Sequence, residues 1–250
     1  MNVALAVVVL PPALALGSFL NVVAARLPEG RSLVSPPSSC RGCGTRIAWR
    51  DNVPVLSYFL LRGRCRSCGA GFGARYLAVE LLTAALVAAC FLRFGLTADA
   101  FVAAFFVSVL VVLSAIDMER RILPDKIVLP SVAVVLAAQV ALHPDRAVEW
   151  MAASLGAALF LFLALLAYPR GMGMGDVKLC LLLGAMLGWS VSVGLMLGML
   201  AALVPAVVLL ARHGAAARKM GIPFGPFLAL GAVVALFVGD GLLDAYLGSL

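Results

Sequence analysis

Long apolar segments separated by short polar loops dominate the sequence. A helix needs about 20 predominantly apolar residues to cross the hydrocarbon core of a bilayer. Eight segments are apolar enough, at residues 3–25, 76–93, 97–116, 126–142, 149–168, 176–188, 190–212 and 225–247. The sixth is short and nearly continuous with the seventh, and we place the break between them at Gly188 and Trp189. The pattern predicts an all-α polytopic membrane protein with about eight transmembrane helices.

The composition agrees with a membrane protein. Of the 250 residues, 64% are hydrophobic and 12% are charged, whereas soluble domains carry about 25% charged residues. The mean hydropathy is +1.10. The first apolar segment has no basic region before it and no clear cleavage site, so we expect a transmembrane helix there rather than a secretory signal peptide.

Lysine and arginine are distributed unevenly between the loops, and loops rich in them lie on the cytoplasmic side of a membrane. Nine arginines lie at residues 26–75. The loops at 117–126, 169–178 and 212–224 add three, two and three lysines or arginines. Only Arg93 and Arg146 remain for the opposite side. We therefore expect these four loops in the cytoplasm and both termini outside. This topology also explains the net charge of +7, which does not indicate nucleic-acid binding.

The loop at residues 26–75 carries two Cys-x-x-Cys pairs, Cys40 with Cys43 and Cys65 with Cys68, separated by 21 residues. Two such pairs supply four thiolates to tetrahedral zinc. The arginines around them are expected to lower the thiol pKa values and favour the thiolates. Two disulfides are the alternative, which the reducing cytoplasm disfavours. A loop of about 50 residues with a small core needs a cross-link of this kind to fold.

These features divide the chain into three parts. We expect a first transmembrane helix at residues 1–25, a cytoplasmic four-cysteine zinc-binding domain at 26–75 and a seven-helix membrane domain at 76–250. The two remaining cysteines, Cys90 and Cys180, stand alone in apolar segments and are expected to be packing residues.

Two aspartates lie at the ends of apolar segments on the predicted cytoplasmic side. Asp117 ends the third segment, and Asp176 follows the stretch Gly171-Met-Gly-Met-Gly, 59 residues later. An ionisable group at a membrane boundary is costly and marks a functional site. Glycine at alternate positions, including Gly173 and Gly175, lets the backbone approach another chain closely. It also permits the turn after which a helix begins near Asp176. Two carboxylates at one membrane face suit an aspartyl protease, in which one activates water and the other donates a proton.

Other interpretations of the charged residues remain open. Asp176 also suits a structural role in the first turn of a helix, where the helix dipole favours a carboxylate. A dinucleotide-binding glycine motif is disfavoured, because no strand precedes the glycines. Lys178 either biases the aspartates electrostatically or binds lipid headgroups. Glu80 is expected to pair with Arg75 or another loop arginine, and Asp125 to cap the fourth helix.

Short motifs along nearly the whole chain point to one family. They are Asp117 with Pro124-Asp125, Gly173-Met-Gly-Asp176-Val-Lys178, Ile222-Pro-Phe-Gly-Pro-Phe, Gly17-Ser-Phe-Leu-Asn21, Arg26-Leu-Pro28, the two cysteine pairs, Asn52-Val-Pro54, Leu61-Arg-Gly63, and Arg75-Tyr76 through Glu80. In this combination the sequence resembles the type IV prepilin peptidases, which belong to the GxGD class of intramembrane aspartyl proteases.

The resemblance implies that Asp117 and Asp176 are the catalytic pair and that the four loop cysteines hold structural zinc. It is closest to the bifunctional form of the family. Such enzymes of the bacterial inner membrane cut the basic leader from a prepilin or pseudopilin after a glycine at the cytoplasmic face. They then methylate the new N-terminal residue with S-adenosylmethionine, and they serve type IV pili or type II secretion. Arg41, where many relatives have proline, and the run from Gly69 to Gly73 depart from the family pattern but remove no ligand or carboxylate.

Three alternatives are weighed against this interpretation. A peptidase that has lost methylation would leave free N-termini on its products. An ion-coupled transporter predicts ionisable groups near the bilayer midplane and internal repeats, whereas the aspartates fall at segment ends and no repeat is evident. A scaffold that uses the zinc loop for docking would leave the two aspartates unexplained.

Overall fold

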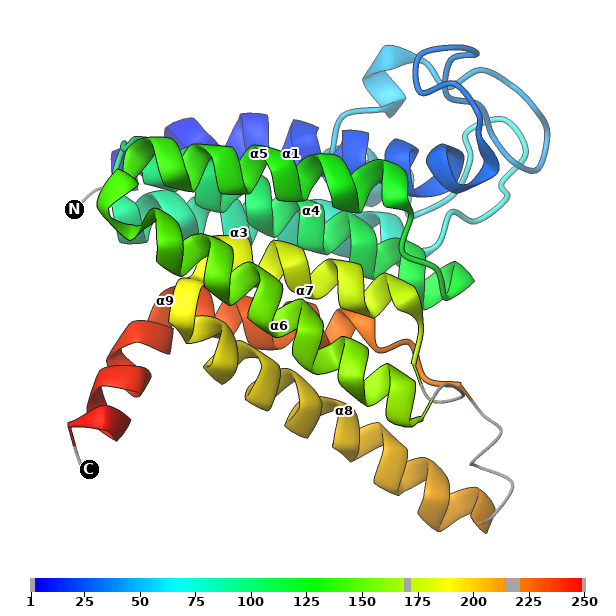
Figure 1. Ribbon diagram of the computed structural model, residues 1–250. Helices are drawn as coiled ribbons and strands as arrows, with labels where there is room; N and C mark the ends of the chain where they lie inside the picture. The colour runs from blue at the N-terminus through cyan, green and yellow to red at the C-terminus, as the bar shows by residue number, and fades with distance from the viewer. Residues whose placement is uncertain (1–2, 169–171, 215–220, 249–250) are drawn as a thin grey trace. The chain divides into compact units, whose positions relative to one another are not determined.

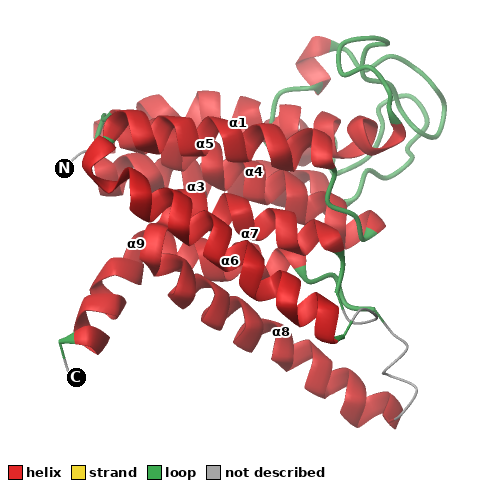
Figure 2. Ribbon diagram, viewed as in Figure 1, coloured by secondary structure: helices red, strands yellow, loops and turns green. Residues whose placement is uncertain are grey.

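The computed structural model describes residues 3–168, 172–214 and 221–248, which form helices and loops without strands (Figures 1 and 2). The long helices are α1 (Val3–Arg26), α3 (Ala74–Phe94), α4 (Ala98–Arg120), α5 (Asp125–Leu142), α6 (Ala147–Ala167), α7 (Met174–Leu187), α8 (Val191–His213) and α9 (Gly225–Leu247). The short elements are α2 (Leu56–Leu60), η1 (Leu27–Glu29), η2 (Trp49–Asp51), η3 (Pro144–Arg146) and η4 (Gly188–Ser190). Gly171 of the glycine motif, and Arg170, Arg218 and Lys219 of the charge pattern, lie outside the described residues.

The predicted transmembrane segments agree with the helices of the structure. Among the described residues, seven helical stretches are long and apolar enough to cross a membrane. The longest, Met174–His213, has 40 residues and contains both α7 and α8, joined through η4. The break predicted at Gly188 and Trp189 falls inside η4, so the eight predicted segments correspond to the eight long helices. The all-α polytopic membrane fold is confirmed.

The chain forms two compact units, Met1–Val112 and Leu113–Leu250, which divide within α4. The first unit contains the four loop cysteines and Glu80. The second contains both candidate catalytic residues, Asp117 and Asp176. The division into a helix, a loop domain and a membrane domain at residues 25 and 75 stays a prediction.

In the first unit, α1 and α3 pack side by side. A β-carbon added at Gly17 would lie 2.7 Å from the Cα atom of Glu80, so the two backbones approach as closely as glycine allows. The side-chain amide of Asn21 donates a hydrogen bond to the carbonyl oxygen of Tyr76 at 3.0 Å. Small residues and interhelical hydrogen bonds are the usual means of helix association in a bilayer. This pair of helices therefore supports the cysteine-bearing loop that joins them.

In the second unit, glycines bring neighbouring helices together. A β-carbon on Gly184 of α7 would collide with the carbonyl oxygen of Ala153 on α6, and one on Gly231 of α9 would collide with that of Gly194 on α8. The Ser154 hydroxyl also donates to the carbonyl oxygen of Leu181 at 2.8 Å. The result is two closely packed pairs, α6 with α7 and α8 with α9.

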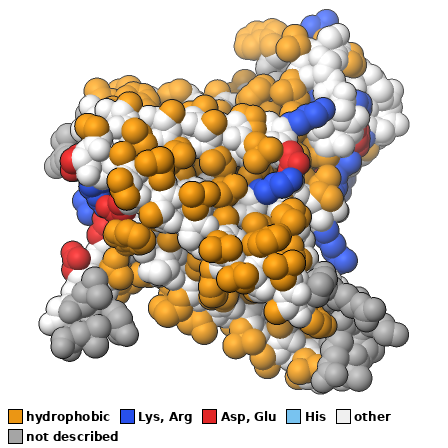
Figure 3. Space-filling model, in the orientation of Figure 1, with side chains coloured by type: hydrophobic (Ala, Val, Ile, Leu, Met, Phe, Trp, Pro, Cys, Tyr) orange, Lys and Arg blue, Asp and Glu red, His pale blue; other side chains and the backbone are white. Residues whose placement is uncertain are grey.

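The apolar surface of the helices is exposed where lipid would cover it (Figure 3). On α6 and α8, Leu159 and Leu203 are more than half exposed. On α7, by contrast, Leu179, Leu182 and Leu183 are almost completely buried. Helix α7 therefore lies in the core of the second unit and carries Asp176 at its first turn. Cys90 and Cys180 are fully buried, in agreement with their predicted packing role.

Candidate active site and metal centre

Asp117 lies in the last turn of α4, and its side chain is buried. The helix ends at Arg120, and the N–H of Arg121 donates to the carbonyl oxygen of Asp117 at 2.8 Å. Arg121 has a positive φ of 56°, which is uncommon for a residue with a side chain and marks a tight turn. Pro124 then precedes the first residue of α5. The local sequence thus ends one helix, reverses the chain and leaves Asp117 at the helix end, as predicted.

Asp176 lies in the first turn of α7 and is also buried. Its Oδ2 accepts a hydrogen bond from the N–H of Gly173, and its own N–H donates to the Gly173 carbonyl oxygen, both at 3.2 Å. A β-carbon on Gly175 would lie 3.0 Å from the Cβ of Leu123. The glycine at 175 therefore lets α7 begin directly against the turn that follows Asp117. The structural capping role and the candidate catalytic role fall on the same carboxylate.

A backbone group of α9 contacts Asp117, which the sequence did not predict. The N–H of Gly225, the first residue of α9, donates to Oδ2 of Asp117 at 3.0 Å. A β-carbon at this position would lie 2.9 Å from the same oxygen. The N-termini of α9 and α7 thus each donate to one aspartate, and their partial positive charge favours the carboxylates. The glycine between Pro223 and Pro226 was the available signal, although sequence analysis used that motif only as part of the family resemblance.

Both carboxylates line one cavity of about 260 Å³. Its walls are formed by Asp117, Arg121, Ile122, Leu123, Asp125, Gly173, Gly175 and Asp176. The two carboxylates are close enough to interact electrostatically. A water molecule occupies about 30 Å³, so the cavity has room for water beside the two carboxylates. Because both aspartates lie at helix ends, this arrangement suits chemistry at the membrane boundary rather than an ion path through the midplane.

Lys178 has a partner that the sequence did not indicate. Its Nζ lies 2.8 and 2.7 Å from the two carboxylate oxygens of Asp125. Asp125 is the first residue of α5 and lines the cavity. The ion pair therefore joins the starts of α5 and α7 at the rim of the site. The predicted roles of Lys178 toward the aspartates or lipid stay predictions.

Glu80 belongs to the first unit and holds the cysteine-bearing loop. Its Oε2 accepts a hydrogen bond from the N–H of Val55 at 2.8 Å, and its side chain is buried. Val55 has a positive φ of 63° at the start of α2, a conformation that a β-branched residue rarely adopts. Glu80 therefore ties the loop at Val55 to α3.

The four loop cysteines come together as the sequence predicts. Their Sγ atoms all lie within 4.8 Å of one another, and those of Cys40 and Cys68 are 3.7 Å apart. Four sulfurs bound to zinc at about 2.3 Å are roughly 3.8 Å apart, so the cluster fits a tetrahedral zinc ion. All six cysteines of the chain are free, which favours a metal site over the disulfide alternative.

The two cysteine pairs have the same backbone geometry. The N–H of Gly44 donates to the carbonyl oxygen of Cys40, and the N–H of Gly69 donates to that of Cys65, both at 2.9 Å. Both glycines have a φ of 71°, which a residue with a side chain adopts only with strain. The N–H of Gly42 also donates to the Cys40 sulfur at 3.3 Å. These repeated turns point four sulfurs at one centre.

Local hydrogen bonds set the pKa values of the thiols. Those involving Thr45 lower the pKa of Cys43 to about 6, and the backbone of Cys68 and Ser67 lowers the pKa of Cys65. For Cys68 a backbone hydrogen bond from Ala70 lowers the pKa, but the neighbouring thiols and burial outweigh it and raise the pKa to about 12. The prediction that arginines lower the thiol pKa values was wrong, because hydrogen bonds cause the lowering.

Comparison with known proteins gives a consistent result. A model of the bacterial peptidase A24 N-terminal domain matches residues 12–94, and a model of the type IV leader peptidase family matches residues 104–213. No solved structure matches the chain significantly.

Curated relatives named prepilin leader peptidase/N-methyltransferase are similar over most of the chain. The protein of Bacillus subtilis strain 168 is 33% identical over 246 residues, which cover 94% of each chain. That of Myxococcus xanthus strain DK1622 is 40% identical over 215 residues, covering 82% of this chain and 63% of the relative. That of Pseudomonas aeruginosa PAO1 is 35% identical over 266 residues, covering 94% of this chain and 90% of the relative.

Proposed function

The chain belongs to the type IV leader peptidase family, and we propose that it cuts the basic leader from prepilins or pseudopilins after a glycine. We propose Asp117 and Asp176 as its catalytic pair. The observation that carries this assignment is that two buried aspartates, each at a helix end, line the same cavity. Peptide hydrolysis needs one base and one acid, and two neighbouring carboxylates supply both when they share one proton.

In the proposed reaction the ionised aspartate takes a proton from water, and the resulting hydroxyl oxygen attacks the scissile carbonyl carbon. The protonated aspartate donates its proton to the carbonyl oxygen. When the tetrahedral intermediate collapses, the carbon–nitrogen bond breaks and the leaving amine takes a proton from the protonated aspartate. One hydroxyl group of the intermediate gives its proton to the other aspartate, which restores the singly protonated pair. The N–H groups of Gly225 and Gly173 each hold one oxygen of an aspartate, which keeps the two carboxylates oriented through these steps. Because the two aspartates share one proton, we assign the roles of base and acid to the pair and not to either residue.

The proposed orientation places this cavity and the zinc loop at residues 26–75 on the cytoplasmic face of the bacterial inner membrane, with both termini outside. The unequal distribution of lysine and arginine supports it. A prepilin-type substrate has a basic leader followed by an apolar helix, so its cleavage point lies at the same membrane boundary as the aspartates. Residues 76–250 then form the peptidase domain.

We further propose that the four cysteines bind zinc as a structural ion. The thiolate set and its spacing support this, and the bound ion would hold the loop in one conformation. The names of the relatives also support a second reaction, in which S-adenosylmethionine supplies a methyl group to the N-terminal amine that cleavage exposes.

Mass spectrometry of the products tests both reactions. The purified protein is mixed with a prepilin that retains its leader, with and without S-adenosylmethionine. The proposal predicts a leader that ends in glycine, and a mature chain that carries one added methyl group only when the methyl donor is present. An uncut prepilin would refute the peptidase assignment. A cut but unmethylated chain would support the alternative of a peptidase without the second activity.

A further inference from the structure

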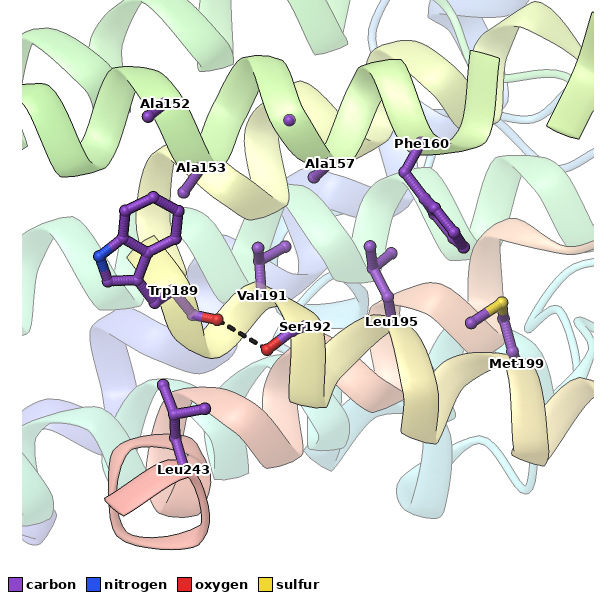
Figure 4. Close-up of a pocket in the computed structure, with 11 residues that line it drawn as sticks. Ala152, Ala153, Ala157, Phe160, Trp189, Val191, Ser192, Leu195, Met199 and Leu243 are labelled. Carbon is purple, nitrogen blue, oxygen red and sulfur yellow. Dashed lines mark hydrogen bonds between the residues drawn. The ribbon is translucent and has the colours of Figure 1, made fainter. Parts of the chain in front are cut away.

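An apolar groove of about 530 Å³ lies between α6 and α8, away from the aspartates' cavity. Figure 4 shows the side chains of Ala153, Ala157 and Phe160 on α6 facing Leu195 and Met199 on α8 across it. The remaining lining residues are Ala152, Gly156, Trp189, Val191, Ser192 and Leu243. None of the described residues that line the groove is charged, and the Ser192 hydroxyl donates to the Trp189 carbonyl oxygen at 2.8 Å. The groove therefore suits an apolar occupant.

Gly156 is a residue that packing within the chain does not explain. Glycines at the other helix contacts of this unit, such as Gly184 and Gly198, have backbone atoms within 3 Å of the position of a β-carbon. A β-carbon on Gly156 would meet nothing within 4 Å, although the residue lies in the middle of α6. Glycine there destabilises the helix relative to alanine. Small residues at an open helix face in a bilayer allow another helix to approach closely.

The contacts between α6 and α7 fix the depth of the groove relative to Asp176. Ala153 packs against Gly184, and the two helices run in opposite directions (Figure 1). Asp176 precedes Gly184 by eight residues, and Phe160 follows Ala153 by seven. At about 1.5 Å per residue these steps are roughly 12 and 10 Å in the same direction. The Phe160 end of the groove therefore lies at about the depth of Asp176.

The contacts between α8 and α9 give the same depth relative to Asp117. Gly198, the neighbour of Met199, packs against Leu228, with a β-carbon position 3.0 Å from the Cα of that residue. Gly225, which donates to Asp117, lies three residues before Leu228, or about 4.5 Å along the helix. Both walls of the groove therefore end at the depth of the aspartate pair.

We propose that this groove binds the apolar helix of the substrate, in the part that follows the scissile bond. The proposal rests on the proposed peptidase function. From Ala152 to Phe160 the groove spans eight residue steps of α6, or roughly 12 Å, which matches about two turns of a helix. The substrate helix lies between α6 and α8 and enters sideways from the lipid. Its N-terminal end then reaches the boundary at which Asp117 and Asp176 lie.

Filling the groove tests this proposal. In a Gly156→Leu variant the β-carbon meets no described atom within 4 Å, and the rest of the side chain extends into the groove. For a full-length prepilin in lipid nanodiscs, KM is expected to rise by about tenfold while kcat changes little, because only helix binding is lost. Ala137→Leu, at an exposed position of α5 outside the groove, is the matched control and is expected to keep the wild-type KM.

Photocrosslinking gives a second readout that does not depend on catalysis. A benzophenone amino acid at position 192 is expected to crosslink to the apolar helix of the prepilin, and one at position 137 is not. A wild-type KM for Gly156→Leu together with crosslinks only to lipid, or to a second copy of the chain, would overturn the groove proposal. If the variant with benzophenone at position 192 crosslinks the prepilin but the wild-type protein does not cut it, the peptidase proposal fails and the groove proposal stands.

Discussion

A methyl group added at Gly225 would press on the carboxylate of Asp117. The β-carbon of a Gly225→Ala variant would lie 2.9 Å from Oδ2 of Asp117 and 3.3 Å from Cδ2 of Leu123. A separation of 2.9 Å is shorter than a β-carbon tolerates, so the neighbouring group has to shift. The carboxylate must therefore move, and its 3.0 Å hydrogen bond from the Gly225 N–H is weakened or lost.

The size of the effect follows from that hydrogen bond. A hydrogen bond to a charged group contributes about 1.5–3 kcal/mol. If this contribution is lost in the transition state, kcat/KM falls by roughly 10- to 100-fold, since about 1.4 kcal/mol corresponds to a factor of ten. Zinc content and the thermal unfolding temperature are expected to stay near the wild-type values, because the substitution acts on one side chain of the site.

Two other glycines provide graded comparisons in the same assay. In Gly175→Ala the β-carbon would lie 3.0 Å from the Cβ of Leu123, so α7 or the turn must shift slightly, and we expect a smaller loss of about three- to tenfold. In Gly173→Ala the nearest atom, Oδ2 of Asp176, is 3.6 Å away, and we expect a change within about twofold. The assay is prepilin cleavage in detergent, scored as kcat/KM. Wild-type activity in Gly225→Ala, or the reverse order among the three variants, would refute the reasoning.

Further predictions concern the ion pair, the metal and the first unit. Because the pair between Lys178 and Asp125 is partly exposed, we expect Lys178→Ala to lower kcat/KM less than about fivefold, and exchanging the two residues to restore the rate. Cys65→Ser is expected to reduce the zinc content, measured by elemental analysis, from about one ion per chain to none. Glu80→Ala is expected to lower the free energy of unfolding by about 1–3 kcal/mol, since a loop N–H loses its acceptor, whereas Glu80→Gln keeps most of it. Gly17→Ala is expected to cost about 1–3 kcal/mol through the backbone contact between α1 and α3, measured as a shift of the unfolding transition.

The helices could be predicted from the sequence because lipid imposes a simple rule. About 20 apolar residues must occur together for a helix to cross the bilayer, and the long helices other than the 14-residue α7 follow such segments. Even the short α7 was separable from α8, because a glycine stands at the break. In the structure this residue, Gly188, adopts a positive φ of 56°. The cysteine cluster was predictable because two pairs of cysteines, each separated by two residues, have the spacing of zinc ligands.

The contacts of the site could not be predicted, because they join segments that are far apart in the sequence. The N–H of Gly225 reaches Asp117 across 108 residues, and Lys178 reaches Asp125 across 53. A backbone donor leaves no signature in residue type, apart from a glycine that admits close approach. The two carboxylates were identifiable as a pair, since charge at a membrane boundary is rare, but their supporting groups depend on how the helices pack.

The most direct test of the catalytic pair compares Asp117→Asn and Asp176→Asn with the wild-type protein, on a prepilin with its leader and on a pilin whose leader has already been removed. Asparagine keeps the shape of each side chain but can neither activate water nor share the proton. Both variants are expected to lose at least about a hundredfold in cleavage rate. Both are also expected to keep their zinc and to methylate the pre-cleaved pilin, which would show that the fold is intact. Cleavage at the wild-type rate by either variant would contradict the account.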